Sequence, residues 1–176
     1  MQHGGVLALD LATRAGWALW KPGEPVRHGI WAGPQTGDDV GRFIMAFEDW
    51  LQPFLAAEQP SWVVFEAPIL TAGKTTPATA RKLMSIAAVC EVVCRRGGVM
   101  YRQANNKAVR KHFIGHGNLR SDESKRRTLE VCRAKGWAPR DHNAADALAL
   151  LDYAVTVLAL EVPWQTGAWF EGREPA

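Results

Sequence analysis

The chain has 176 residues, of which 47% are hydrophobic and 22% charged, a composition typical of one globular domain and not of a disordered or fibrous protein. Its three cysteines, Cys90, Cys94 and Cys132, lack CxxC spacing and lie in apolar segments, so we expect reduced core residues. The N-terminus lacks the basic start and apolar core of a signal peptide, and the longest apolar segments are interrupted by charges. We therefore expect a cytoplasmic protein without a membrane partner.

Charge is distributed unevenly along the chain. The net charge is only +3, but residues 105–140 contain ten Lys or Arg residues against three acids. This segment therefore carries a formal charge of +7, and the remainder carries −4. A basic segment of this kind indicates either an anionic partner such as a nucleic acid or a well-solvated face.

The first third of the chain predicts three strands and a helix. Val6–Leu9 is a short apolar run with glycines before it and a polar turn after it, as in a strand buried on both faces. Gly16–Trp20 and Arg27–Gly33 follow as strands, and the "KPGEP" between them predicts a hairpin turn. Asp38–Ala57 has the 3-4 apolar spacing of an amphipathic helix, in which Pro53 is expected to cause a kink or an end.

The remainder predicts two further strands and four helices. Trp62–Glu66 follows a strand and a helix, which implies a strand parallel to the first, joined by a right-handed crossover. The other expected elements are a helix from Thr76-Pro77 to Arg96, a strand over 99–103, basic helices over 105–113 and 121–135, and an apolar helix from His142 to about Leu160. We expect one α/β domain over 1–160, with three antiparallel strands followed by parallel ones, and a C-terminal tail over 161–176.

Three carboxylates occupy places where apolar residues are expected. Asp10 and Glu66 each end a buried strand, and ligands of open α/β sheets bind beyond the carboxyl ends of parallel strands. Asp146 is surrounded by alanines and leucines, with Asn143 one helical turn before it on the same face. A buried ionised carboxylate without a partner costs several kcal/mol, so each acid requires a cation, hydrogen bonds or a raised pKa.

One divalent metal centre satisfies all three acids. Oxygen ligands of this kind favour Mg²⁺ or Mn²⁺ over zinc. The alternative is structural: Asp10 caps a turn, Glu66 pairs with Arg14 or Lys74, and Asp146 faces solvent. Carboxylates with two bound ions activate water and stabilise phosphoryl charge, and the basic segment then neutralises phosphates beside them. This combination indicates a nuclease.

The stretch "TAGKTT" (71–76) invites comparison with a phosphate-binding loop. The first glycine of that motif falls on Pro68, and a proline cannot donate a backbone N–H to a phosphate. We therefore expect no nucleotide cofactor. Lys74, in the same stretch, is a candidate DNA contact or a solvated surface lysine.

These motifs resemble the RuvC-like Holliday-junction resolvases of the ribonuclease H-like superfamily, particularly the shorter forms carried by phages and prophages. "LALDLATRAGWAL" resembles the first strand with its catalytic Asp, and "VVFEAP" the strand that ends in Glu. "NKAVRKHFIGHGNLRSDESKRR" is similar to the basic region and "HNAADALALLDYA" to the final helix. The resemblance covers about residues 5–155 and implies a ribonuclease H-like fold.

The resemblance also implies site residues. Asp10, Glu66 and Asp146 match metal-ligand positions, and the fourth ligand, usually Asp or His in the family, falls on Asn143. Either the Asn143 carbonyl oxygen serves there and weakens one metal site, or His142 or Asp141 takes over. Six cations are candidate DNA contacts, namely Arg14, Lys74, Lys107, Arg110, Lys111 and Lys125.

The expected activity is that of a Mg²⁺-dependent endonuclease, with two ions per active site, acting on Holliday junctions or related branched DNA. The resemblance implies a homodimer that cuts two strands symmetrically. The alternative that Asn143 supports is a junction-binding protein whose catalytic activity is weak or lost.

Overall fold

The computed structural model describes residues 4–66, 68 and 75–157, and the structural statements below refer to these residues. The expected tail, Lys74 and the end of the last helix lie outside them. The elements are β1 Val6–Asp10, β2 Arg14–Trp20, β3 Arg27–Ala32, α1 Val40–Glu58, β4 Trp62–Glu66, α2 Pro77–Arg96, β5 Met100–Ala104, α3 Asn106–Ile114, α4 Ser121–Ala134 and α5 His142–Thr156.

The five strands form one mixed sheet in the order β3-β2-β1-β4-β5. The strand β1 pairs antiparallel with β2, which pairs antiparallel with β3. On its other side β1 pairs parallel with β4, and β4 pairs parallel with β5. The predicted α/β class, with three antiparallel strands followed by parallel ones, is confirmed.

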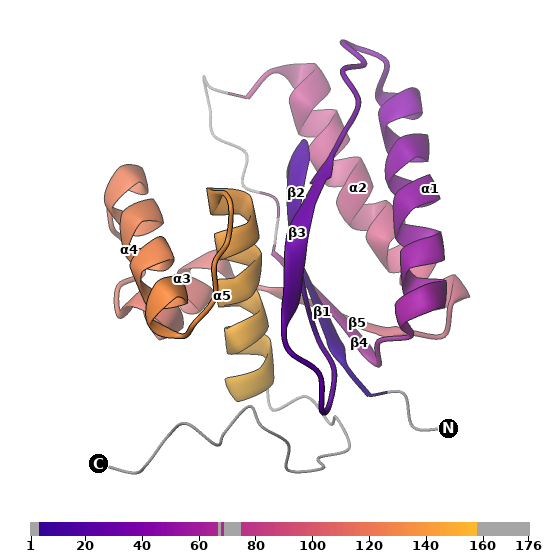
Figure 1. Ribbon diagram of the computed structural model, residues 1–176. Helices are drawn as coiled ribbons and strands as arrows, with labels where there is room; N and C mark the ends of the chain where they lie inside the picture. The colour runs from indigo at the N-terminus through magenta and orange to yellow at the C-terminus, as the bar shows by residue number, and fades with distance from the viewer. Residues whose placement is uncertain (1–3, 67, 69–74, 158–176) are drawn as a thin grey trace.

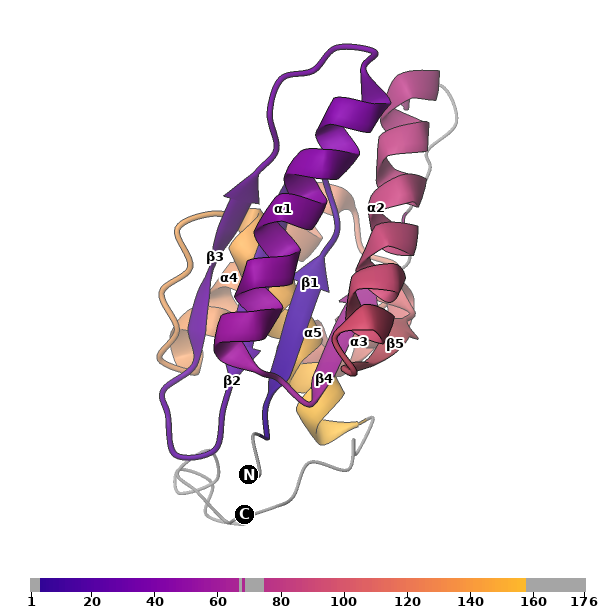
Figure 2. The ribbon, with the colours of Figure 1, turned by 90° about the vertical axis from the view of Figure 1, so that its right-hand side faces the viewer.

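Helices cover both faces of the sheet (Figures 1 and 2). The helices α1 and α2 pack on one face over an apolar cluster that includes Phe43, Phe47 and Ile86. On the opposite face α5 lies against β1 and β2, and α3 and α4 pack on α5. The basic segment is therefore carried by two helices that reach the sheet through α5.

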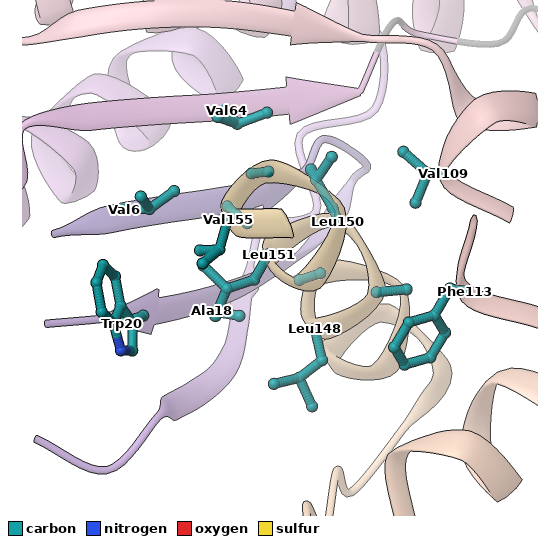
Figure 3. Packing of buried hydrophobic residues seen from close by; sticks show 14 of the residues in the cluster. Val6, Ala18, Trp20, Val64, Val109, Phe113, Leu148, Leu150, Leu151 and Val155 are labelled. Carbon is teal, nitrogen blue, oxygen red and sulfur yellow. The ribbon is translucent and has the colours of Figure 1, made fainter. Parts of the chain in front are cut away.

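The helix α5 is apolar almost all round because it is enclosed between the sheet and the basic helices. Figure 3 shows Leu151 and Val155 beside strand residues such as Val6, with Phe113 of α3 beyond the helix. Ten of its fifteen residues are buried. An acid in the first turns of such a helix is thereby carried close to the sheet.

Most predicted boundaries agree with the structure within one or two residues. Thr76 caps α2 by accepting a hydrogen bond from the backbone N–H of Thr79, as the Thr-Pro pair predicts. The expectation that Pro53 could end the first helix is wrong, because α1 continues through it to Glu58. Burial of Leu51 and Leu55, which flank the proline, holds the helix in place across it.

The three cysteines are free and buried, as predicted. Among the described residues, no helix combines the length and the apolar character that a membrane crossing requires.

Candidate active site

The carboxylates predicted from the sequence come from three elements that meet at one edge of the sheet. Asp10 is the last residue of β1 and Glu66 the last residue of β4. These strands are parallel neighbours, with Leu9 opposite Phe65, so both acids emerge at the same edge. Asp146 lies in the second turn of α5, which packs across β1 and β2.

Gly16 permits the close approach of α5. It lies opposite Asp10 in the β1 and β2 pairing. A Cβ atom at this position would lie 1.9 Å from the backbone oxygen of Asn143, so no residue with a side chain fits there without displacing the helix. The first turn of α5 is therefore held against the sheet beside Asp10. The sequence analysis did not identify this role, although a glycine within a strand is a known signal of close backbone approach.

Burial and mutual repulsion raise the pKa values of the two strand-end acids. The pKa of Asp10 is raised well above its ordinary value by burial first, and then by the negative charges of Glu66 and Asp146. Glu66 is only 6% exposed, and burial raises its pKa to about 7, against the opposing effect of a hydrogen bond from Asn106. Each acid therefore lies within electrostatic reach of the others.

The pKa of Asp146 is also raised, and more positive charges oppose the shift than at the other two acids. Burial raises its pKa, while the positive charges of Arg110, His142 and Lys125 oppose the shift. Arg110 also lowers the pKa values of Asp10 and Glu66. The Arg110 guanidinium is thus the cation that acts on all three acids, although it forms no ion pair with them among the described residues.

The structural alternative predicts that Glu66 pairs with Arg14 or Lys74, and among the described residues its partner is a different side chain. Glu66 accepts a hydrogen bond from the side-chain amide of Asn106 in α3, a contact that the sequence analysis missed. Its suggested partner Arg14 pairs instead with Asp141, at 3.7 Å. Within the described part of the chain, no Lys or Arg lies within ion-pair distance of the three carboxylates.

The candidates for a fourth ligand differ in their surroundings. Asp141 caps α5, because its carboxylate accepts a 2.9 Å hydrogen bond from the backbone N–H of Ala144. His142 is exposed, and Asn143 is half-buried beside Gly16. Asp141 is therefore already engaged at the start of the helix.

The acids offer a donor set of oxygens only, which suits Mg²⁺ or Mn²⁺. A bound divalent cation would offset the burial, and the mutual repulsion, that raise their pKa values. As placed, however, no three Asp, Glu, His or Cys side chains among the described residues lie close enough together to hold one metal ion. One oxygen of Glu66 is turned to Asn106 instead. The three acids fit a metal centre by their chemistry and by their place in the fold. Their carboxylate oxygens, as placed, do not surround one common position.

Of the predicted DNA-binding cations, Arg110 and Lys125 lie within electrostatic reach of Asp146. Lys107 and Lys111 are exposed on α3 and Lys125 is exposed on α4, while Arg110 is half-buried toward the acids. Arg14 is exposed beside the start of α5. Lys74 lies outside the described residues.

A different buried acid, Asp152, lies further along α5. It is 3% exposed, and its two carboxylate oxygens lie 2.9 Å from His112 Nε2 and 2.9 Å from Lys135 Nζ. The Lys135 ammonium also lies over the rings of Phe113 and Trp137. This network ties the ends of α3 and α4 to α5.

Comparisons of the sequence with protein-family models and with curated proteins found no match. The fold, in contrast, is similar to solved structures. RuvC of Thermus thermophilus superposes with a TM-score of 0.65 at 18% identity, covering 86% of this chain and 95% of that one. The same protein in complex with a Holliday junction substrate gives 0.64 at 19% identity, covering 84% of this chain and 90% of that one.

The yeast mitochondrial Holliday junction resolvase Ydc2 is a more distant neighbour. It gives a TM-score of 0.57 at 11% identity, covering 83% of this chain and 75% of that one. Since these identities are low, the likeness concerns the arrangement of the backbone. The chain has a ribonuclease H-like fold, structurally similar to RuvC and Ydc2.

Proposed function

We propose that this chain is a metal-dependent endonuclease that hydrolyses phosphodiester bonds in branched DNA. The observation that carries the proposal is that three carboxylates, the buried Glu66 and the half-buried Asp10 and Asp146, lie at one sheet edge with no cationic partner at ion-pair distance among the described residues. Leaving such acids unpaired is costly, and functional sites are where such costs are tolerated.

Asp10, Glu66 and Asp146 would hold Mg²⁺ or Mn²⁺, with the carbonyl oxygen of Asn143 as a neutral fourth ligand and two ions per site. When bound, the ions supply Lewis-acid stabilisation of the phosphoryl oxygens and an activated water. Asn106 orients one oxygen of Glu66. Arg110 contributes positive charge next to the scissile phosphate.

The basic helices support DNA as the substrate. Lys107, Lys111 and Lys125 are exposed on the two helices that pack on α5 beside the acids. Such cations contribute affinity for phosphates without selecting a sequence. The fold neighbour from T. thermophilus was solved with a Holliday junction substrate, which supports a four-way junction as the first DNA to test. We include a homodimer in the proposal, because symmetric cutting of two strands requires two active sites.

A second candidate is a junction-binding protein without efficient cleavage. Two observations favour it: the amide of Asn143 replaces a charged ligand, and the described acids do not converge on one metal position. Tight junction binding with no cutting in either Mg²⁺ or Mn²⁺ would favour this candidate.

Cleavage of a labelled four-way junction by the wild-type chain and Asp10→Asn tests the proposal. We expect Asp10→Asn to lower the cleavage rate by at least 100- to 1,000-fold, on the order of the loss when a group that stabilises transition-state charge is removed. Junction binding should be equal or tighter, because a negative charge is removed. Asp49→Asn is the matched control, since Asp49 is exposed on α1 across the sheet. Equal cleavage by Asp10→Asn and the wild type would refute the site assignment.

A further inference from the structure

The two halves of α4 are attached to the rest of the molecule by different kinds of side chain. We call residues 121–128 its N-terminal half and residues 129–134 its C-terminal half. The buried side chains of the N-terminal half are Ser124 and Thr128, which are both small and polar. The hydrophobic residues that pack toward α5 lie in the C-terminal half, namely Leu129, Val131 and Cys132. Because apolar burial is the main force that docks a helix, the C-terminal half is the better anchored one.

The polar contacts of α4 show the same difference. Directly after the C-terminal half, the Lys135 ammonium lies 2.9 Å from the Asp152 carboxylate of α5. The ion pairs of the N-terminal half join charged side chains of α4 to one another. Among the described residues, no hydrogen bond or ion pair joins the N-terminal half to α3 or α5. This half is therefore held on the fold by little besides the packing of two hydroxyl side chains.

The start of α4 also lacks a side-chain cap. Each of the other four helices begins after a residue whose side chain accepts a hydrogen bond from a backbone N–H of the first turn, namely Asp39, Thr76, Asn105 and Asp141. The residue before α4 is Arg120, whose side chain makes no such bond. An uncapped start leaves backbone N–H groups of the first turn without protein partners and weakens the end of the helix.

The two halves meet at a position where the helix can bend. The Thr128 hydroxyl donates a 2.9 Å hydrogen bond to the Ser124 carbonyl oxygen, one turn back in the same helix. Bonds of this kind compete with the backbone ladder and often bend helices. The N-terminal half can therefore swing about Thr128 while the C-terminal half stays docked.

The N-terminal half lies beside the acidic centre, by which we mean Asp10, Glu66 and Asp146. The positive charge of its residue Lys125 lowers the pKa of Asp146. A groove of about 370 Å³ is lined by α4 side chains, including Lys125, and by His142 at the start of α5. Figure 1 shows α4 on the outer side of α5. Movement of this half would thus change access to the acidic centre from one side.

We infer that the N-terminal half of α4 is a lid, which swings between the closed position seen here and an open position and is held closed when a DNA strand occupies the acidic centre. This inference rests on the proposed function. The protein alone supplies few contacts that favour the closed position, whereas phosphates at the acidic centre would attract Lys125 and the neighbouring Arg126. DNA therefore interacts better with the closed position, which is the condition for a ligand to shift such an equilibrium.

Hydrogen exchange of individual backbone amides, followed by NMR, tests the opening in the free protein. Amides 124–128 should exchange about 10-fold or more faster than amides 129–134, because local opening exposes only the N-terminal half. Amides 80–84 of α2 are the matched control, since they occupy the equivalent positions in a helix that Thr76 caps. They should show no such excess over the amides that follow them. Equal exchange in the two halves of α4 would overturn the inference.

Supplying the missing cap should hold the lid closed. Arg120→Ser should slow the exchange of amides 124–128 by about 5-fold, the effect of a typical cap. Arg133→Ser is the matched control, because it removes the same charge from the exposed surface of the C-terminal half and adds no cap. It should leave these amides unchanged. Unchanged exchange in Arg120→Ser would also overturn the inference.

A four-way junction added in Ca²⁺ tests the closing step, with cleavage followed separately in Mg²⁺. The bound junction should slow amides 124–128 by about 10-fold or more, to the level of the C-terminal half, and leave amides 80–84 unchanged. A bound junction without this effect would overturn the lid and leave the nuclease proposal intact. If no junction binds, the proposed function fails, and exchange in the free protein and in Arg120→Ser decides whether this half opens.

Discussion

Two carboxylate sites beside or within α5, namely Asp152 and the acidic centre, differ in how their negative charge is compensated. Asp152 is 3% exposed and is held by His112 and Lys135, each at 2.9 Å. Glu66 is 6% exposed and has only a neutral amide as its hydrogen-bond partner among the described residues. Asp10 and Asp146, near Glu66, add repulsion instead of compensation.

The difference shows that this fold can supply cations to a buried acid where the acid is structural. The same helices that provide His112 and Lys135 also carry Arg110 and Lys125, which remain outside ion-pair distance of the acidic centre. An acidic centre left without close cations has room for cations from solution. We therefore propose that Asp152 contributes to stability and that the acidic centre contributes to function.

Neutralising Asp152 and neutralising Glu66 should change the free energy of unfolding in opposite directions. These are the largest stability changes that we expect. Asp152→Asn leaves Lys135 without its carboxylate and should lower the free energy of unfolding by about 3 kcal/mol, since breaking a buried pair is strongly destabilising. Glu66→Gln, in metal-free protein at pH 8, should raise it by about 3 kcal/mol, the equivalent of a pKa moved from 4.5 to about 7.

The sign for Glu66 follows from proton binding. Its pKa is higher in the folded state, so the folded chain binds more protons and loses stability as pH rises from about 4.5 to about 7. The advantage of Glu66→Gln should therefore be absent at pH 4 and complete at pH 8. Urea unfolding with a chelator at both pH values measures this, and a loss of stability in both variants would remove the distinction between the two groups.

Gly16→Ala should disrupt the acidic centre and leave the Asp152 network in place. The added methyl group would meet the Asn143 backbone, and α5 must move away from Asp10. We expect cleavage to fall about 100-fold, the loss associated with a displacement of about 1 Å at a reacting site. Gly41→Ala is the matched control, because its Cβ would meet only the Asp39 carboxylate, at 3.6 Å. Unchanged cleavage by Gly16→Ala would show that the contact does not position the site.

Glu58 extends the comparison to an acid that is paired with cations near the surface. Hydrogen bonds from Arg27 and then Lys21 lower its pKa to about 2. Its contribution is thus present above pH 4.5 and is lost as pH falls toward 2. Because the Arg27 side chain is 44% exposed, Glu58→Gln should cost only about 1 kcal/mol at neutral pH. Unfolding at pH 7 and pH 3.5 should show the difference shrinking, and a constant difference would contradict the pairing.

Local patterns predicted the elements well because each depends on neighbouring residues. The strand ending in Asp10 and the capped helix after Thr76 follow from apolar runs and from capping chemistry. The predicted end of the helix at Pro53 is wrong, because tertiary burial of Leu51 and Leu55 outweighs the local penalty of a proline.

The sequence by itself determined which acids form the candidate site, because a carboxylate at the end of an apolar strand or inside an apolar helix is conspicuous in one dimension. Only the tertiary structure decided their surroundings: the contact of Asn106 with Glu66, the approach of α5 over Gly16, and the pairing of Arg14 with Asp141. These depend on distances between segments that lie far apart in the chain. Burial and electrostatic interactions act through those distances, so spacing along the chain does not encode them.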